Sequence, residues 1–542
     1  MKKILLFTCL VLALNAAAQV RYQRKTYISG SSSILFPVVD VTLDSYASTH
    51  YLAALNDVWN GSSYVTRLLR YDAGAGTPVA VTEYSVSGLD MRPVRVLTVQ
   101  GFTYVAGYTN TINGERFFLL KVNSATNAVV FCNVYNSTVG GTFNQHVTDM
   151  AYDGTGTFFI TGSFQYSGNS AVFLAQVNTS GSLLDYRTMY LAGYSEEVCS
   201  IQWYAPNAIY IAGVATVFGF PNSTYGFLLT YDATAATGTA NVYQYYAISA
   251  SERLRKFNLM RIAKRMYAVG ETYHPFIGNP QTLIVSQLNS GTQLPAVTTN
   301  YSAGNYRWTS RINYTGGGLL ALSGYVDMMD ASAYGVANVF FNNTTTYSTG
   351  SRYFLNTSYT SVESILDNAG FIHTCATRGG DTLFRIKALS SNGQTTCDHA
   401  FTFPPTTQFT PVVTSATCSV ISDGYTFPSI GTVIPTALTP GNSTPCFFDP
   451  MAQRLAGPSE NAAPGAWPNP AGDQLHISLP GNLSGTIRAE FLDLSGRLIR
   501  SEMLRNESSQ ELPVADLLEG MYLLRISDGN GFSETLRFVK RQ

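Results

Sequence analysis

Short apolar stretches recur along the body of the chain at a nearly constant interval. Five of them end at a glycine, and these are Tyr104–Gly107, Phe159–Gly162, Tyr210–Gly213, Tyr267–Gly270 and Leu322–Gly324. Stretches that end at Leu55 and Cys375 occupy the same place without the glycine, and successive positions lie 51 to 57 residues apart. A repeat of this length with no helical periodicity predicts β units that each bury an apolar face against the next unit.

A second strand follows each of these positions and stops at a turn residue 15 to 19 residues later. Asn123, Asn178 and Asp232 are examples, and such residues suit tight turns because they tolerate left-handed backbone. Further strand patterns on either side bring each unit to four strands. Seven such units predict an all-β fold with a seven-bladed β-propeller. A β-helix, which has shorter repeats, and a string of β-sandwiches, which has longer ones, are the alternatives.

Changes in composition and residue pattern divide the chain into five segments. We expect a signal peptide at 1–18, the propeller at 19–403, an extension at 404–450, a linker at 451–466 and a C-terminal domain at 467–542. Lys2 and Lys3 before a short apolar run and Ala16–Ala18 are typical of a secretory signal peptide. Either 21–29 or 398–403 could close the ring as the outer strand of the last blade, which would protect open sheet edges.

Proline and cysteine set the extension apart from the propeller. Twelve of the 22 prolines lie between Pro404 and Pro470, and proline cannot donate a hydrogen bond to a sheet. Four cysteines, Cys375, Cys397, Cys418 and Cys446, fall close together in a chain that is expected to be exported. Of the three possible connectivities we favour Cys375–Cys397 and Cys418–Cys446, so we expect a disulfide-tied extension that packs on the ring or forms a few strands.

Charge and motifs narrow the possible chemistry. Only 12% of the residues are charged and the net charge is −1, which argues against a nucleic-acid partner. None of the six histidines lies three or four residues from another, and no Cys-x-x-Cys occurs, so no metal site is predicted. We find no catalytic or phosphate-binding motif and predict no cofactor. No stretch outside the signal region is long and apolar enough for a transmembrane span.

The C-terminal segment carries a recognisable order of motifs. Trp467 precedes Pro468-Asn469-Pro470, Gly496 follows a short strand, and Gly520 and Tyr522 begin a strand that leads to a basic end at Lys540. This order resembles the C-terminal sorting domain of cargo of the type IX secretion system of Bacteroidetes. The resemblance implies a small β-sandwich-like domain, recognition by the secretion machinery, and a protein that is secreted or attached to the cell surface. On this resemblance the residues Pro468, Asn469, Pro470, Gly496, Gly520, Tyr522 and Lys540 form the sorting motif.

The propeller itself shows candidate binding residues in the loops between the second and third strand of each unit. The best of these are Trp59, Tyr108, Phe220, Tyr273, His274 and Phe276. Aromatic rings beside Asn, Ser and Gly suit an extracellular glycan or protein, although many such rings simply pack between blades. We therefore expect a noncatalytic binding or adhesion protein. The alternative is a secreted enzyme that degrades polysaccharide or peptide with acids converging on the ring's channel. Asp57 and Glu115 are among the carboxylates on the loop face.

Overall fold

The computed structural model shows two compact units, Met1–Phe447 and Phe448–Gln542. The structure describes residues 22–27, 38–46, 49–74, 78–111, 114–137, 144–166, 169–190, 193–204, 207–217, 224–233, 238–245, 253–262, 265–273, 280–289, 292–293, 296–300, 304–314, 319–328, 334–342, 347–354, 359–367, 370–378, 382–389, 399–401, 407–409, 413–422, 425–426, 432–438, 465–467, 471–479, 486–493, 497–504, 509–528 and 533–541. In these ranges all regular elements are β-strands, and no helix is long and apolar enough to cross a membrane.

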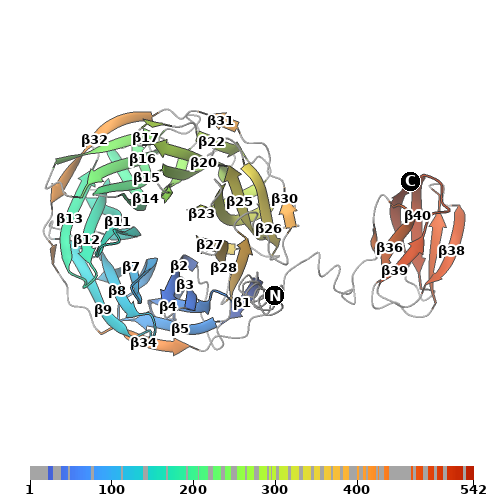
Figure 1. The fold of residues 1–542 in the computed structure, drawn as a ribbon, viewed down its shortest axis with the longest axis horizontal. Helices are drawn as coiled ribbons and strands as arrows, with labels where there is room; N and C mark the ends of the chain where they lie inside the picture. The colour runs from blue at the N-terminus through green and yellow to red at the C-terminus, as the bar shows by residue number, and fades with distance from the viewer. Residues whose placement is uncertain are drawn as a thin grey trace, which may run out of the picture. The chain divides into compact units, whose positions relative to one another are not determined.

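The first unit is a β-propeller, as the sequence predicted, and Figure 1 shows its sheets arranged as a ring. From the inside outward, blade 1 is β2 (Val38–Tyr46), β3 (Thr49–Trp59), β4 (Tyr64–Asp72) and β5 (Pro78–Ser85). Blade 2 is β6 (Arg92–Val99), β7 (Phe102–Thr111), β8 (Gly114–Asn123) and β9 (Val129–Ser137). Blade 3 is β10 (Gln145–Tyr152), β11 (Thr157–Tyr166), β12 (Asn169–Asn178) and β13 (Leu183–Tyr190).

The remaining blades repeat the same antiparallel order. Blade 4 is β14 (Tyr194–Tyr204), β15 (Ala208–Val217), β16 (Thr224–Asp232) and β17 (Gly238–Tyr245). Blade 5 is β18 (Arg253–Ile262), β19 (Arg265–Tyr273), β20 (Pro280–Asn289) and β22 (Ala296–Asn300), with β21 (Thr292–Gln293) beside β20. Blade 6 is β23 (Gly304–Tyr314), β24 (Leu319–Met328), β25 (Tyr334–Asn342) and β26 (Tyr347–Phe354). Blade 7 is β27 (Tyr359–Leu366), β28 (Phe371–Arg378), β29 (Thr382–Leu389) and β1 (Tyr22–Tyr27).

The last blade shows how the ring closes. β1 pairs with β29 over its whole length, from Tyr22 opposite Lys387 to Tyr27 opposite Thr382. The N-terminal strand is therefore the outer strand of blade 7, and of the two segments proposed from the sequence this is the one that closes the ring. The other, at 398–403, contains β30 (His399–Phe401), which pairs with β26 of blade 6 instead.

The recurrent glycines have a steric reason. Each innermost strand of blades 2 to 4 carries a β-bulge opposite the glycine of the second strand. A Cβ atom at Gly162 would lie 2.0 Å from the carbonyl oxygen of His146, and one at Gly213 would lie 2.1 Å from that of Glu197. Real Cβ contacts are never this short, so only glycine fits where the bulged strand approaches.

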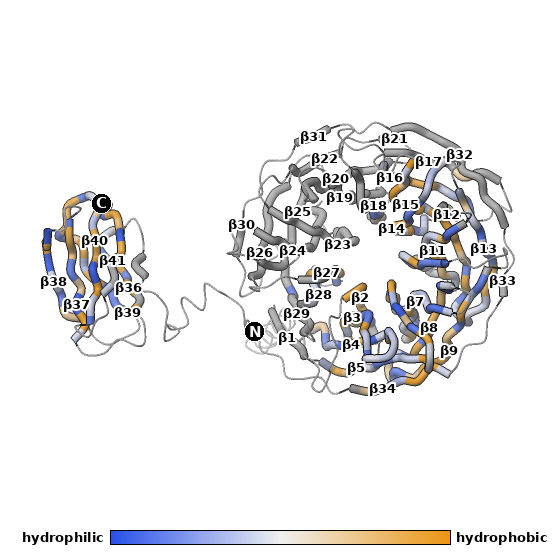
Figure 2. The backbone as a smooth tube through the Cα atoms, turned by 180° about the vertical axis from the view of Figure 1, so that it is seen from behind, coloured by the Kyte–Doolittle hydropathy of each residue, from blue (hydrophilic) through white to orange (hydrophobic). Residues whose placement is uncertain are grey.

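The blades bury their apolar faces against one another, and Figure 2 shows hydrophobic segments along the strands of blades 1 to 4. One core cluster combines Phe117 and Tyr135 of blade 2 with Phe158 and Phe173 of blade 3. The rings of Phe117 and Phe173 stack with centroids 5.6 Å apart across the two blades. A single blade has no partner for this face, which explains why the apolar pattern repeats along the sequence.

The extension forms a strap around the outer rim of the ring. After β30, the chain adds β31 (Thr407–Phe409), β32 (Val413–Ser422), β33 (Tyr425–Thr426) and β34 (Ile434–Leu438). β31 pairs with β22 of blade 5, β33 with β9 of blade 2, and β34 with β5 of blade 1. β32 pairs with both β17 and β13, so it joins blades 3 and 4 into one nine-stranded sheet. We call the strands β30 to β34 the strap, and Figure 1 shows its strands outside the blades.

The structure does not show the expected Cys375–Cys397 disulfide, and the Cys418–Cys446 pairing stays a prediction. Among the cysteines that the structure describes, no disulfide is formed, and Cys375 lies buried on β28 in a core cluster with Val41 and Leu52. Cys397 and Cys446 lie outside the described residues, and Cys418 lies in β32. Backbone pairing along the blade edges therefore attaches the described part of the extension. Its proline at 435 sits in β34, an edge strand, where a missing N–H is tolerated.

The second unit is a small two-sheet β domain. One sheet consists of β35 (Gly465–Trp467), β36 (Gln474–Ser478) and β39 (Ser509–Pro513), and the other of β38 (Leu498–Leu504), β37 (Ile487–Leu492), β40 (Gly520–Ser527) and β41 (Ser533–Lys540). Residues of both sheets, including Leu475, Ile477, Phe491 and Leu524, share one buried core. The first strand starts at Gly465, two residues before the start expected from the sequence.

Candidate functional site

A row of aromatic and charged side chains crosses blades 1 to 3 at the ends of their strands. Trp59 ends β3 and Tyr64 begins β4, directly opposite each other in the register of the hairpin. Their rings meet edge to face, with centroids 5.1 Å apart. Trp59 keeps 38% of its surface exposed, which is unusual for so large an apolar side chain. It therefore marks the accessible end of the row.

Arg92 connects blade 1 to blade 2. It begins β6, and its guanidinium lies 4.1 Å from the ring centre of Tyr64 and 5.6 Å from that of Tyr108. The same guanidinium donates to the carboxylate of Asp57, with Nε 3.0 Å and Nη2 2.8 Å from Oδ2. Asp57 lies two residues before Trp59 on β3 and is 7% exposed. The ion pair thus holds the planar cation between the two tyrosine rings.

The row continues into blade 3 through Tyr108 and His146. Their rings lie 4.3 Å apart, and His146 Nδ1 is 3.4 Å from Oε2 of Glu115. Glu115 is fixed in turn because its N–H donates to the side-chain oxygen of Asn144. We call Trp59, Tyr64, Arg92, Tyr108, His146 and Glu115 the aromatic row.

Burial and neighbouring charge set the protonation states of Tyr108 and Arg92. Burial raises the pKa of Tyr108 to about 12, so its hydroxyl stays protonated and can donate at neutral pH. Burial alone would lower the pKa of Arg92, but the hydrogen bond and the charge of Asp57 raise it overall. The row therefore contains a permanent cation, which Asp57 holds in place, and a neutral phenol.

The structure brings together only part of the predicted binding set. Trp59 and Tyr108 belong to the same row, although Tyr108 is only 8% exposed. Tyr273 ends β19, whereas Phe220, His274 and Phe276 lie outside the described residues. Tyr64, Arg92 and His146 were not predicted, because only the closed ring places strand ends from neighbouring blades in contact. One sequence signal could have pointed to Arg92, because charged residues are few in this chain and Arg92 stands at the start of a strand.

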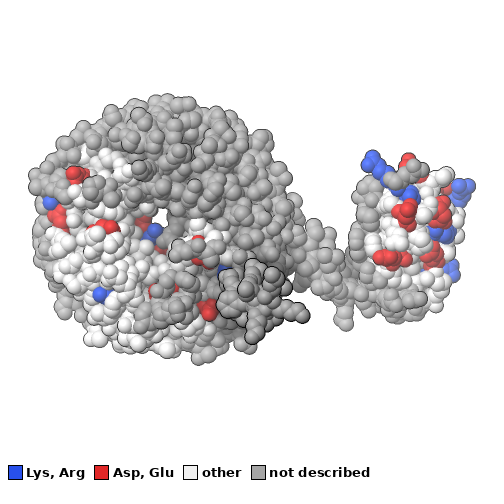
Figure 3. All heavy atoms as spheres, in the orientation of Figure 1, with Lys and Arg blue, Asp and Glu red and all other residues white. Residues whose placement is uncertain are grey.

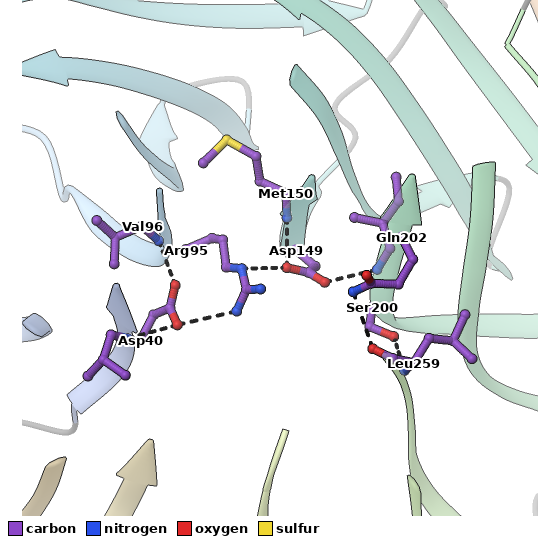
Figure 4. A network of polar contacts seen from close by, with 10 residues as sticks. Asp40, Arg95, Val96, Asp149, Met150, Ser200, Gln202 and Leu259 are labelled. Atoms are coloured by element: carbon purple, nitrogen blue, oxygen red, sulfur yellow. Dashed lines mark hydrogen bonds and ion pairs between the residues drawn. The ribbon is translucent and has the colours of Figure 1, made fainter. Parts of the chain in front are cut away.

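The innermost strands carry a second polar cluster, which Figure 4 shows from close by. Arg95 of β6 lies between two carboxylates, with Nη1 3.2 Å from Oδ1 of Asp40 and Nε 2.8 Å from Oδ1 of Asp149. All three residues directly follow the bulge of their strands, in blades 1, 2 and 3. Figure 3 shows the ring hollowed at its centre, with acidic and basic side chains at the rim.

Backbone bonds between blades occupy these carboxylates. Asp40 accepts the N–H of Val96 at 2.7 Å, and Asp149 accepts that of Ile201 at 2.9 Å. Ser200 continues the pattern by accepting the N–H of Leu259 at 2.7 Å. These side chains join the innermost strands of blades 1, 3 and 4 to the next blade. Over the described residues, no cluster of His, Cys, Asp and Glu is arranged to hold a metal ion.

The described sorting-motif residues stabilise the second unit. The hydroxyl of Tyr522 donates to the carbonyl of Leu518 at 2.7 Å, and its ring stacks on Phe538. Lys540 is buried at the end of β41, where its Nζ donates to the carbonyl of Arg541 at 3.0 Å. Gly520 begins β40. Pro468, Asn469, Pro470 and Gly496 lie outside the described residues.

Comparison with known proteins identifies this second unit. Residues 465–541 match the family model described as a secretion system C-terminal sorting domain. No curated protein sequence matches the chain. Among solved structures, the endosialidase of phage phi92 is 8% identical over 71% of this chain and 72% of its own, with a TM-score of 0.34. The extracellular domain of a putative hybrid two-component system of B. thetaiotaomicron is 10% identical over 92% and 78%, with a TM-score of 0.20.

The chain therefore ends in a secretion sorting domain. It is a cargo protein of the type IX secretion system, and it is secreted or attached to the cell surface. This confirms the class and the destination that the C-terminal motifs predicted. The sorting domain covers only the end of the chain, so the activity of the propeller has to be argued from its own residues.

Proposed function

We propose that the propeller is a noncatalytic binding protein whose ligand docks on the aromatic row. The observation that carries this proposal is the exposed indole of Trp59 at the end of a row that neighbouring side chains hold in place. Rigid aromatic side chains with polar edges give a large contact area at low cost in conformational entropy. A secreted protein with such a surface is suited to bind material outside the cell.

The enzyme alternative has less support in the described part of the channel. Glycoside hydrolysis needs two carboxylates about 5–10 Å apart that are free to act as acid and as base or nucleophile. Asp40 and Asp149 instead bond to Arg95 and to backbone N–H groups of the next blade. These bonds occupy the carboxylate oxygens, so the two groups are not free to contact a substrate.

Incubation with arrays of extracellular polysaccharides and proteins, with product release followed in parallel, tests this proposal. We expect retention on at least one array member without any cleavage product, and loss of that retention in a Trp59→Ala variant. Product release that disappears in Asp149→Asn, while Trp59→Ala stays active, would instead establish the enzyme alternative. An Asp149→Asn variant with an unchanged unfolding transition ensures that the loss is not simply unfolding.

A further inference from the structure

The aromatic row contains few charged groups, and the polar contacts of these groups lie largely within the site. Arg92 pairs with Asp57 at 2.8 Å, and His146 lies 3.4 Å from Glu115. Next to the row, Asp90 accepts hydrogen bonds from the side chain of Asn110 and from the N–H of Tyr64, both at 2.9 Å. A charged ligand would have to compete with these internal pairs, and it would gain little in exchange.

Trp59 has uncharged polar neighbours, which keep part of their hydrogen-bonding capacity although Asn60 Oδ1 accepts from Ser62 and Ser63 and Asn110 donates to Asp90. Asn60 and Ser62 follow it in the exposed β3–β4 turn, and Asn110 is exposed at the end of β7. Amides and hydroxyls of this kind match the hydroxyl groups of a sugar, which also donate and accept. The indole supplies the broad apolar surface that the C–H face of a sugar ring can cover.

A protein partner fits these observations less well. Stable protein interfaces bury about 1,200–2,000 Å² in total and have a largely apolar centre with several anchoring side chains. Within the aromatic row, Trp59 is the one large apolar side chain that the structure describes as exposed. A single exposed ring with a polar rim offers a stacking platform rather than the centre of such an interface.

We infer that the ligand of the aromatic row is an uncharged saccharide chain, with one sugar ring stacked on Trp59 and its neighbours running toward Arg92 and His146. This inference rests on the proposed function and adds the ligand class to it. The ion pair with Asp57 keeps Arg92 in place, and contacts with Tyr108 and Glu115 keep His146 in place, so the saccharide meets a preformed surface that it does not need to order.

Calorimetric titration of the full-length protein tests the ligand class. The probes are uncharged gluco-, manno-, galacto- and xylo-oligosaccharides, together with uronic-acid and amino-sugar oligomers of the same length. We expect binding of at least one uncharged series and weaker or no binding of the charged ones. Trp59→Ala should weaken binding at least tenfold, and Trp59→Phe should restore part of it because a smaller ring remains.

The matched control is Tyr190→Ala. Tyr190 is 39% exposed, almost as much as Trp59, but it lies on β13 at the outer rim and should leave binding unchanged. If uronic-acid or amino-sugar oligomers bind best and Trp59→Ala still abolishes binding, the ligand class is wrong and the proposed function stands. If uncharged oligosaccharides bind equally well to wild type and Trp59→Ala, the row is not their site. If neither the oligosaccharides nor the arrayed polymers and proteins bind, both proposals fail.

Discussion

Replacing Gly162 with alanine is expected to destabilise the propeller by more than about 3 kcal/mol, because a methyl group cannot fit there. The new Cβ would lie 2.0 Å from the carbonyl oxygen of His146 and 2.8 Å from the ring of Phe173. The carbonyl belongs to the bulged strand β10, which is hydrogen-bonded to β11 and cannot retreat without breaking that pairing. Denaturant unfolding of the wild type and the variant measures the loss.

Gly154→Ala in the same blade is the control for this prediction. Gly154 has a φ of +82°, but a Cβ there would meet nothing within 4 Å. Its replacement should therefore cost only the backbone strain of a left-handed residue, about 1–2 kcal/mol. Equal losses for the two variants would show that the bulge does not approach the glycine as described.

Ending the chain after residue 398 is expected to have the second large effect, because it removes the strap. β32 alone pairs with eight residues of β17 and four of β13, and the remaining strap strands cover four more blades. Each lost backbone hydrogen bond contributes about 0.5–1.5 kcal/mol, so the total should exceed about 5 kcal/mol. The outer strands would also become open edges that promote aggregation.

A chain that ends after Phe447 is the matched comparison, because it retains the strap and lacks only the second unit. We expect this longer chain to be monomeric and to unfold as the full-length protein does, while the shorter chain aggregates or unfolds at a much lower temperature. Size-exclusion chromatography and thermal unfolding report both effects. A shorter chain as stable and monomeric as the longer one would show that the strap contributes little.

The repeat could be predicted from the sequence because its cause is local. The glycine recurs in five of the seven units and accompanies a bulge in the preceding strand, and an Asn or Asp at the following turn recurs in six. The sorting domain was predicted from motifs that lie in order along the chain. Two features, the strap and the candidate site, could be predicted only in part. We expected the extension to pack on the ring or form a few strands, but its prolines argued against its pairing along the blades, and an edge strand such as β34 tolerates proline all the same.

The candidate site could also be predicted only in part from the sequence. Trp59 and Tyr108 could be selected because they are aromatic residues in loops on the predicted face. Their partners Arg92 and His146 come from different blades, and their contacts depend on how neighbouring blades pack. Blades 1 to 3, which carry the row, are also blades whose outer strands the strap joins. The strap thus stabilises the arrangement on which the row depends.

A disulfide between the strap and blade 4 tests most directly whether the strap pairs with the outer strands of the ring. Cys418 of β32 lies opposite Ala240 of β17 in the antiparallel register, and directly paired Cα atoms are about 4.5–5.5 Å apart, within the range for a disulfide. In a chain with Cys446→Ser to prevent competition, Ala240→Cys should form a disulfide with Cys418 on mild oxidation. Asn241→Cys, which lies opposite Thr417 in the same register, should not. Peptide mapping of the oxidised variants would confirm the strap if only Ala240→Cys links to Cys418, and it would contradict the strap if neither variant does or both do equally.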